Sequence, residues 1–440
     1  MPLEEVASRI PHETSEETAA RLSWWTEARF GMFIHFGLYA MPARHEWIRN
    51  YEEISNEDYE KYFERFDPDL FDAGEWARAA KAAGMKYVVL TTKHHEGFCM
   101  FDSKVTDYKI TNTPFGRDLV AEFVEAVRAE GLKVGFYYSL LDWHHPDFTV
   151  DGLHPLRNGD VDKLNEGRDM ARYRQYMKDQ VTELLTNYGK IDIMWFDFSY
   201  PRNDKWGKGR DDWDSPGLLT LARTLQPGII VDNRMDLNDV ENGFDFMTPE
   251  QFKVTEWPTH NGRRHPWETC QTFSGSWGYF RDETSWKSDA QCLDLLISTV
   301  AHGGNLIMNV GPTARGEFDG RARERLDGYG RWMHANSRSI YGCTEAPEGF
   351  EAPEHSVLTY NPKTNRLYIH LFHYPAGQLG VKFGSRIAYA QFLHDGSEIQ
   401  VKPMPDWQAK ASDSTGYDSY LNFPVLKPAV EIPVIECYLK

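Results

Sequence analysis

Short apolar runs alternate with longer helical patterns from Arg29 to Tyr341, and this alternation restricts the fold more than any other feature of the sequence. It is typical of βα units built around a parallel sheet. Six runs are clear strand candidates: Gly31–Gly37, Lys86–Thr92, Lys133–Ser139, Ile191–Asp197, Ile229–Asn233 and Asn305–Gly311. Two weaker candidates, Phe244–Pro249 and Glu268–Thr272, would complete a closed set of eight strands.

Three helical segments between these runs each end at a glycine. They are Ala73–Ala83 before Gly84, Leu119–Glu130 before Gly131, and Met170–Tyr188 before Gly189. A glycine directly after a helix supplies the left-handed conformation that closes many helices. Polar and aromatic residues gather at the carboxyl end of nearly every strand candidate, where barrel enzymes build their sites. The sequence therefore predicts an α/β fold, a TIM-like (β/α)8 barrel rather than an open doubly wound sheet.

The pattern changes after Tyr341. The stretch EAPEGFEAPEHS indicates a linker, and short segments with period-two alternation follow it, as in the strands of a β-sandwich. At 440 residues the chain is also longer than one hydrophobic core usually serves. We expect a catalytic barrel domain over residues 1–345 and an antiparallel β-sandwich domain over residues 346–440.

Charge and composition exclude several classes of partner. The formal net charge of -18 would repel phosphate backbones and anionic lipid surfaces, and no long apolar run offers a membrane span. We expect no nucleic-acid partner and no membrane partner, while a homo-oligomer stays open. The five cysteines have no CxxC spacing, and the N-terminus carries acids where a secretory signal would carry basic residues. Both features predict a cytoplasmic protein, unless a signal has been trimmed.

Asp197 ends a strand candidate whose alternation places Ile193, Trp195 and Asp197 on one face. A carboxylate beside an indole at a barrel mouth suits sugar chemistry, because the ring packs against a pyranose while the carboxylate attacks the anomeric carbon. The alternative is that Asp197 caps the N-terminus of the following helix, and this residue taken alone does not decide between the two roles.

Glycoside cleavage needs a second carboxyl group, which protonates the leaving oxygen and later activates water. Glu250 lies in FDFMTPEQF, a segment that should reach the same barrel mouth. Glu268 competes for this role because it follows Trp267, whose bulk would desolvate the carboxyl group and raise its pKa. The sequence leaves this choice open. Glu46 is a third carboxylate near the first strand candidate.

Other side chains near strand ends suit sugar binding. His35 lies on the first strand candidate, and His94 and His95 follow the second. Neutral imidazoles can hydrogen-bond sugar hydroxyls, although hydrogen bonding within the barrel explains each histidine equally well. Adjacent histidines on extended chain point to opposite faces, and the chain has neither HExxH nor CxxC. We therefore predict no metal and no cofactor.

Arg234 follows the fifth strand candidate and would place a guanidinium near Asp197, keeping that carboxylate ionised or holding a ring hydroxyl. A surface salt bridge is the alternative for a lone arginine. Trp47, Trp195 and Trp277 are candidates for stacking on a sugar, with burial in the core as their alternative.

Taken together, these segments resemble glycoside hydrolase family 29, the α-L-fucosidases, from Trp24 to Asp319. The resemblance rests on six motifs in the family's order: WWTEARFGMFIHFGLYAMPA, KYVVLTTKHHEGFCMFDS, GLKVGFYYSLLDW, IDIMWFD, SWGY and HGGNLIMNVGPTARGEFD. It implies retaining hydrolysis of terminal fucose on glycans through a covalent fucosyl-enzyme on Asp197. Glu250 matches the acid/base, and Glu268 stays in reserve.

The same resemblance assigns fucose binding to nine residues: His35, Glu46, Trp47, His94, His95, Tyr137, Trp195, Arg234 and Trp277. Tyr137 is preferred to Tyr138. One departure is Phe198, where many relatives carry glycine, which would reshape the leaving-group side of the pocket. The rival interpretations are a barrel glycosidase for a related sugar, a carbohydrate-binding barrel protein without turnover, and a metal-dependent barrel hydrolase.

Overall fold

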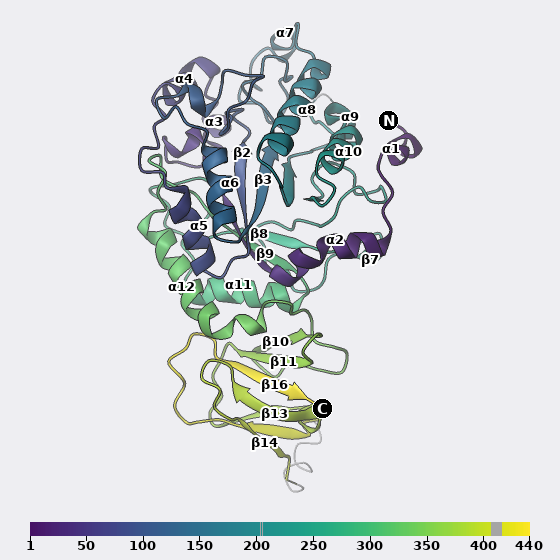
Figure 1. Ribbon diagram of the computed structural model, residues 1–440, viewed down its shortest axis with the longest axis vertical. Helices are drawn as coiled ribbons and strands as arrows, with labels where there is room; N and C mark the ends of the chain where they lie inside the picture. Colours follow the sequence, from purple (N-terminus) through teal and green to yellow (C-terminus); the bar gives the residue numbers. More distant parts are fainter. Residues whose placement is uncertain (203, 205, 406–415) are drawn as a thin grey trace.

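The computed structural model describes residues 1–202, 204, 206–405 and 416–440. Its central sheet is entirely parallel, with the spatial order β5-β4-β3-β2-β1-β9-β8. Figure 1 labels β2, β3, β8 and β9 of this sheet. The strands are β1 (Phe30–Ile34), β2 (Tyr87–Lys93), β3 (Lys133–Ser139), β4 (Ile193–Asp197), β5 (Ile230–Val231), β8 (Glu268–Thr272) and β9 (Asn305–Val310). Each corresponds to a run that the sequence nominated, and Glu268–Thr272 matches its prediction at both ends.

The sheet closes into a barrel through residues 244–250, which lie between β5 and β8. Isolated parallel bridges join Phe246 to Asp232 on one side, and Met247 to Trp267 and Glu250 to Cys270 on the other. Phe244–Pro249 is therefore the eighth position of the barrel, as predicted, but it is not a regular strand. Pro249 has no backbone N–H to donate to a ladder, which is one reason that pairing stays sparse here. The expectation of a (β/α)8 barrel is confirmed.

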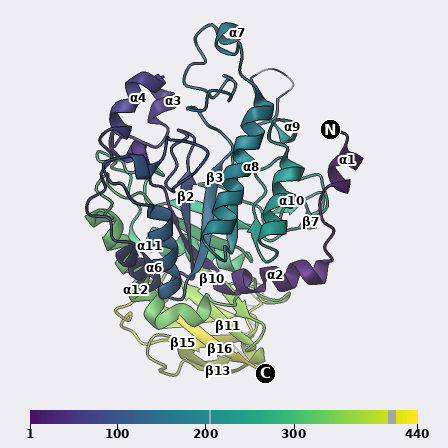
Figure 2. The same ribbon diagram turned by 45° about the horizontal axis from the view of Figure 1, so that its top comes forward.

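Helices pack around this barrel (Figures 1 and 2). The long ones are α2 (Ser15–Ala28), α5 (Ala73–Ala82), α6 (Leu119–Ala129), α8 (Met170–Asn187), α10 (Ser215–Leu225), α11 (Asp289–Ala301) and α12 (Gly320–Asn336). The shorter ones are α1 (Leu3–Ser8), α3 (Ile48–Tyr51), α4 (Asn56–Phe63), α7 (Val161–Leu164) and α9 (Arg210–Trp213). Gly84, Gly131 and Gly189 adopt φ values of 89°, 75° and 71°, so they end α5, α6 and α8 as predicted. None of the helices in the described ranges is long and apolar enough to cross a membrane.

Helix α2 covers the N-terminal end of the barrel. The Trp25 indole donates to Glu268 at 3.3 Å, and its carbonyl accepts from Asn305 at 2.8 Å; these two residues begin β8 and β9. The Trp25 ring also packs on Phe246 with a centroid distance of 4.9 Å. This end of the barrel is therefore closed, and the open end is where the strands finish.

After α12 the chain forms two antiparallel sheets. The larger has the order β10-β11-β16-β13 and the smaller β12-β15-β14. Their strands are β10 (Ser356–Asn361), β11 (Arg366–Leu371), β12 (Gln378–Val381), β13 (Ile387–Phe392), β14 (Gln400–Pro403), β15 (Ser419–Asn422) and β16 (Val434–Leu439), and a separate hairpin joins β6 (Thr259–His260) to β7 (Arg263–Arg264). Buried side chains from both sheets, among them Leu367 and Leu421, form one hydrophobic core, which makes a β-sandwich.

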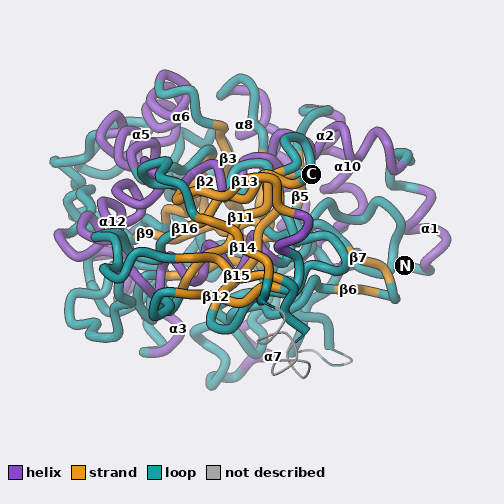
Figure 3. The backbone as a smooth tube through the Cα atoms, turned by 90° about the horizontal axis from the view of Figure 1, so that it is seen from below, coloured by secondary structure: helices purple, strands orange, loops and turns teal. Residues whose placement is uncertain are grey.

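The sandwich packs beneath α11 and α12, at the end of the molecule opposite α3, α4 and α7 (Figure 1), and its strands lie in front of the barrel when the molecule is seen from below (Figure 3). The Trp332 indole donates to the carbonyl of Ile432 at 3.2 Å across this contact. The sandwich therefore lies away from the open end of the barrel.

Candidate active site

All eleven residues that the sequence nominated for catalysis or substrate binding line one cavity of about 340 Å³. They come from β3 and β4 and from the segments after β1, β2, β5 and β8, so they meet at the open end of the barrel. Three further residues complete the lining: Phe33, Phe198 and Cys270. Residues more than two hundred positions apart therefore form a single pocket.

Asp197 is the last residue of β4 and is buried, with 7% of its surface exposed. Its Oδ1 accepts from Arg234 Nη1 at 3.0 Å, and its Oδ2 accepts from the Tyr137 hydroxyl at 2.7 Å. Burial raises the pKa of Asp197, while the Arg234 charge and the Tyr137 hydroxyl oppose that rise. The two donors thus hold a desolvated carboxylate in its ionised form and in a fixed orientation.

Arg234 also holds Glu250, whose Oε2 lies 2.7 Å from Nη2. One guanidinium therefore contacts both carboxylates. It is fixed from two other directions, because Nε donates to the Thr248 hydroxyl at 2.9 Å and the guanidinium lies 4.6 Å from the centre of the Trp195 ring. The Glu250 side chain is 38% exposed, far more than that of Asp197 at 9%, so Glu250 stands on the solvent side of the pair.

Glu268, the other candidate for the second carboxyl role, does not line the cavity. It is the first residue of β8 and is fully buried near the closed end of the barrel. Its carboxyl group accepts from the indoles of Trp25 and Trp195 at 3.3 and 3.4 Å and from the Tyr87 hydroxyl. Burial raises the pKa of Glu268 to about 7. The structure thus brings Glu250, not Glu268, to Asp197.

Two neighbouring side chains fix the protons on His35 and His95. Asn309 donates its amide to the Trp277 carbonyl at 2.6 Å, so its Oδ1 accepts from His35 Nδ1 at 2.7 Å. Ser139 donates to the Leu141 carbonyl at 2.9 Å, so its oxygen accepts from His95 Nδ1 at 2.6 Å. Each Nε2 is then left as a hydrogen-bond acceptor. Burial lowers the pKa of His35 to about 3 and that of His95 well below its usual range.

His94 and His95 lie on the same side of the chain. Extended backbone would point adjacent side chains in opposite directions, yet both rings line the cavity with centroids 3.9 Å apart. The sequence argument was wrong here because β2 ends at Lys93 and the chain then turns. His94 Nδ1 is buried without a hydrogen-bond partner among the described residues, so it can bind a ligand hydroxyl.

Glu46 presents one carboxylate oxygen to the pocket. Its Oε2 accepts from the backbone N–H groups of Trp277 and Gly278 at 3.1 and 2.9 Å. Its Oε1 is buried and receives no hydrogen bond from the residues described. His45 Nδ1 is 3.3 Å away but already accepts from the backbone of Trp47 at 3.1 Å, so it does not donate. Oε1 is therefore an acceptor kept for a ligand.

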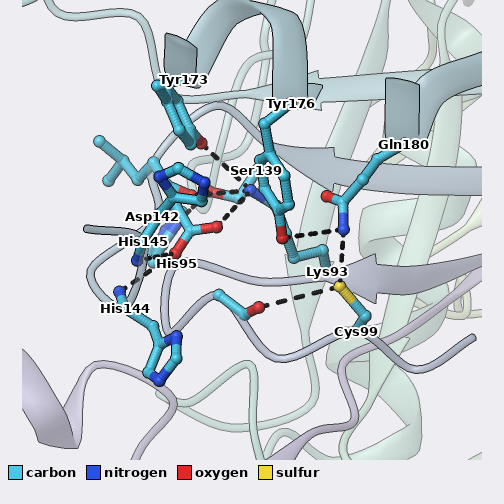
Figure 4. A network of polar contacts seen from close by, with 12 residues as sticks. Lys93, His95, Cys99, Ser139, Asp142, His144, His145, Tyr173, Tyr176 and Gln180 are labelled. Carbon is cyan, nitrogen blue, oxygen red and sulfur yellow. Dashed lines mark hydrogen bonds and ion pairs between the residues drawn. The ribbon is translucent and has the colours of Figure 1, made fainter. Parts of the chain in front are cut away.

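A buried polar network behind the pocket supports the turn that carries the histidines (Figure 4). Lys93 Nζ lies 3.2 Å from Asp142 and donates to the Tyr173 hydroxyl at 3.2 Å, with no exposed surface on the lysine. Next to Asp142, Trp143 donates its backbone N–H to the His95 carbonyl at 2.8 Å. The network joins the turn after β2 to the loop after β3, and the sequence analysis missed it. The signal was a lysine at the end of an otherwise apolar run.

Phe198 has a backbone conformation that L side chains rarely adopt, with φ at 83°. Glycine reaches this conformation without a steric penalty, so a bulky residue is an unusual choice at this position. Its ring packs on Trp47 and His95 with centroid distances of 5.2 and 5.1 Å. Phe198 is thus a wall of the pocket, on the side of Trp47. Within the described residues no group of three or more His, Cys, Asp or Glu side chains is arranged to hold a metal ion.

A pocket at the open end of a (β/α)8 barrel, walled by aromatic rings and holding two carboxylates on one arginine, is the arrangement of a glycoside hydrolase. Comparisons with known proteins define the family. The family model described as Alpha-L-fucosidase matches residues 4–338. Tissue alpha-L-fucosidase of Bos taurus is 31% identical over 377 residues, which cover 80% of this chain and 75% of the relative.

Solved structures agree with this match. Alpha-L-fucosidase isoenzyme 1 from Paenibacillus thiaminolyticus superposes with a TM-score of 0.88 at 43% identity, covering 96% of this chain and 99% of that one. A GH29 alpha-L-fucosidase from Bacteroides thetaiotaomicron, solved as a trapped covalent intermediate with 2-fluoro-fucosyl fluoride, gives 0.83 at 26% identity with both chains fully covered. The chain belongs to the α-L-fucosidase family, glycoside hydrolase family 29. The expectation of a retaining α-L-fucosidase is confirmed at this level, and the rival interpretations are not favoured.

Proposed function

We propose that this chain hydrolyses terminal α-linked L-fucose from glycans with Asp197 as the nucleophile and Glu250 as the acid/base. The observation that carries this assignment is the single guanidinium of Arg234, which contacts both carboxylates inside one aromatic pocket. Two carboxyl groups that contact the same guanidinium must lie close together. This fits retaining enzymes, whose two catalytic carboxyl groups are about 5–5.5 Å apart, whereas those of inverting enzymes are roughly 6.5–9.5 Å apart.

The reaction then has two steps. An Asp197 oxygen attacks the anomeric carbon while the bond from that carbon to the glycosidic oxygen breaks, and Glu250 gives its proton to the leaving oxygen. Glu250 next takes a proton from water, the water oxygen attacks the same carbon, and the Asp197 carboxylate is released. The partial exposure of Glu250 suits this role, because it must meet both the leaving group and water.

The remaining lining residues bind the sugar in this proposal. His35, His94 and His95 are neutral at physiological pH, since burial lowers each pKa, and they exchange hydrogen bonds with ring hydroxyls. The unpartnered Glu46 oxygen accepts a further hydroxyl. The apolar faces of Trp47, Trp195 and Trp277 border the space that the pyranose ring would fill.

The first test is nitrophenol release from a panel of aryl glycosides: α-L-fucoside, β-D-galactoside, α-L-rhamnoside and β-D-glucoside. We expect turnover of the fucoside alone and its loss by several orders of magnitude in Asp197→Ala. Activity on another sugar, or fucoside activity that survives the substitution, would contradict the proposal.

The acid/base assignment has its own test. Glu250→Ala should slow fucosides with poor leaving groups far more than activated aryl fucosides, because only a poor leaving group needs the proton. Glu268→Ala is the matched control, and its effect should not depend on the leaving group. Equal losses on both substrate types in Glu250→Ala, or a leaving-group dependence in Glu268→Ala, would reverse the assignment.

We further infer a division into a catalytic barrel, residues 1–345, and a sandwich, residues 346–440. It is supported by the start of β10 at Ser356 and by a hydrophobic core whose members all lie within residues 346–440. A cytoplasmic location is supported by five cysteines that are all buried and unpaired. Cell fractionation tests the location, and expression of residues 1–345 alone tests the division.

A further inference from the structure

We propose that a groove between the barrel and the sandwich, which we name the junction groove, binds one sugar residue that carries a sulfate or carboxylate group. Six of its lining residues come from the chain after α12 and from β11 and β16: Ser337, Arg338, Tyr341, Arg366, Glu436 and Tyr438. This is a second site on the chain, and it does not depend on the catalytic roles proposed for the two carboxylates of the pocket.

The junction groove lies on the outer face of the larger sandwich sheet. Leu367 points into the sandwich core, so its neighbours Arg366 and Tyr368 point to the opposite face, where they pair in register with Tyr438 and Glu436. The groove has a volume of about 680 Å³ and shares no described residue with the catalytic pocket. It is also at the end of the barrel where α12 meets the sandwich, away from the open end (Figure 1). The two sites are therefore separate.

Arg366 is arranged to receive an anion. Its guanidinium lies 3.7 Å from the centre of the Tyr438 ring, and its Nη1 donates to the carbonyls of Thr364 and Asn365 at 2.8 and 3.4 Å. Its Nε and Nη2 have no hydrogen-bond partner, and it forms no ion pair, among the described residues. The ring and the two carbonyls hold the guanidinium in place. An oxyanion can therefore bind two of its N–H groups without displacing a side-chain partner.

The other charges of the junction groove leave it positive. Arg338 is the second guanidinium in the lining, and its Nη2 donates to Glu436 at 3.2 Å. Glu436 is 2% exposed and also accepts from Gln391 at 2.8 Å and Tyr368 at 3.3 Å, so its own donors satisfy it. Two arginines against one glutamate leave a net positive charge. The formal charge of -18 on the whole chain acts weakly here, because salt screens charges more than about 8 Å apart.

The rest of the lining suits a sugar ring rather than a bare anion. The hydroxyls of Ser337, Thr364 and Tyr438 line the groove and have no hydrogen-bond partner among the residues described. The Tyr341 hydroxyl donates to the carbonyl of Gly84, which fixes that ring in the wall. Free hydroxyls beside aromatic surface fit a pyranose, which has hydroxyl edges and an apolar C–H face. Arg366 would then bind the acidic group that the ring carries.

The test is a binding measurement that needs no turnover. Galactose 6-sulfate and glucuronate are titrated into the protein by calorimetry, with L-fucose in excess to fill the catalytic pocket. Galactose and inorganic sulfate are the comparison ligands. The variants are Arg366→Gln, which removes the charge, and Arg366→Lys, which keeps it. Arg386→Gln is the matched control, because the Arg386 guanidinium lies 3.5 Å from the Phe350 ring and donates to a backbone carbonyl but lies outside the groove.

We expect at least one acidic sugar to bind more tightly than galactose and than inorganic sulfate. Its Kd should rise about tenfold or more in Arg366→Gln, because a hydrogen bond to a charged group is lost. It should rise less in Arg366→Lys and stay unchanged in Arg386→Gln. Fucoside turnover should not change in any of these variants, which reports an intact barrel.

Three results would overturn the site: no saturable binding of either acidic sugar, a Kd that does not change in Arg366→Gln, or an equal change in Arg386→Gln. Binding of galactose as tight as that of the acidic sugars would refute the need for an acidic group, and equally tight binding of inorganic sulfate would refute the sugar. Failure of the unsubstituted protein on every fucoside would refute the proposed function and leave this site standing.

Discussion

The hydroxyl of Tyr137 offers a clean perturbation of the nucleophile, because Tyr137→Phe removes one atom and leaves the ring in place. That hydroxyl donates to Asp197 Oδ2 at 2.7 Å and helps to hold the pKa of the carboxyl group down against burial. A hydrogen bond to a charged group contributes about 1.5–3 kcal/mol, so its loss lowers the ionised fraction of Asp197 by about 10- to 150-fold on the acid side.

The sign of this effect is set by the protonation state that attack requires. Asp197 must be ionised, so activity falls as the pH drops through its pKa, and a higher pKa moves this acid limb to higher pH. On this acid limb, kcat/KM of Tyr137→Phe should be lower than that of the unsubstituted enzyme by the whole of that about 10- to 150-fold factor. Above the limb, where the carboxylate is ionised in both enzymes, most of the difference should vanish. Because the titrations of Asp197 and Glu250 are coupled, the apparent pKa read from this limb describes the two carboxyl groups together.

The assay is kcat/KM on 4-nitrophenyl α-L-fucoside across the pH range. Tyr138→Phe is the matched control, since Tyr138 is the next residue of β3, is also fully buried and donates its hydroxyl to Gln180 at 2.8 Å, away from the pocket. It should cost about 1–3 kcal/mol of folding stability and leave the acid limb in place. A limb that does not move in Tyr137→Phe, or that moves equally in Tyr138→Phe, would refute the reasoning.

Three further outcomes follow from the structure. Burial raises the pKa of Glu268 from about 4.5 to about 7, so the stability that its bound proton provides is lost as the pH rises through that window. The free energy of unfolding of Glu268→Gln should therefore rise by about 2.5 kcal/mol relative to that of the unsubstituted protein between about pH 5 and about pH 8, measured by chemical denaturation. A difference that stays constant with pH would contradict this. His94→Ala should mainly raise KM for the fucoside, and an unchanged KM would remove His94 from the pocket. Lys93→Met should lower the free energy of unfolding by about 3–5 kcal/mol because it leaves Asp142 buried without its ion-pair partner, and addition of Asp142→Asn should recover part of that loss.

The sequence was sufficient for the barrel and for most of the pocket because parallel strands bring their carboxyl ends to one face. Asp197 was recognisable as the last residue of an apolar run, and Gly84, Gly131 and Gly189 marked helix ends by a conformation that only glycine adopts readily. The choice between Glu250 and Glu268 also had a signal. Glu268 begins its run, whereas the residues that line the pocket lie farther along their strands or after them.

Other features were not predictable from local pattern. The turn that brings His94 and His95 to one side depends on where β2 stops, and strand ends are the least certain part of any sequence assignment. The support behind that turn joins Lys93 to Asp142 and Tyr173, which come from distant segments and meet only in the folded barrel. Such contacts have no periodicity that a sequence could display.

Because pairing is sparse at the eighth position of the barrel, the backbone that carries Glu250 is held less firmly than the backbone that carries Asp197. Asp197 ends a strand that is paired on both sides, whereas Glu250 lies on backbone held by isolated bridges. Irregular segments of this kind tolerate insertions and deletions better than regular strands. Insertions or deletions in the segment that carries Glu250 can therefore accumulate during evolution without disturbing β4, which carries Asp197. The same property makes residues 236–243, the irregular loop that precedes the eighth barrel position, the natural place to graft new loops when the range of accepted glycans is to be altered.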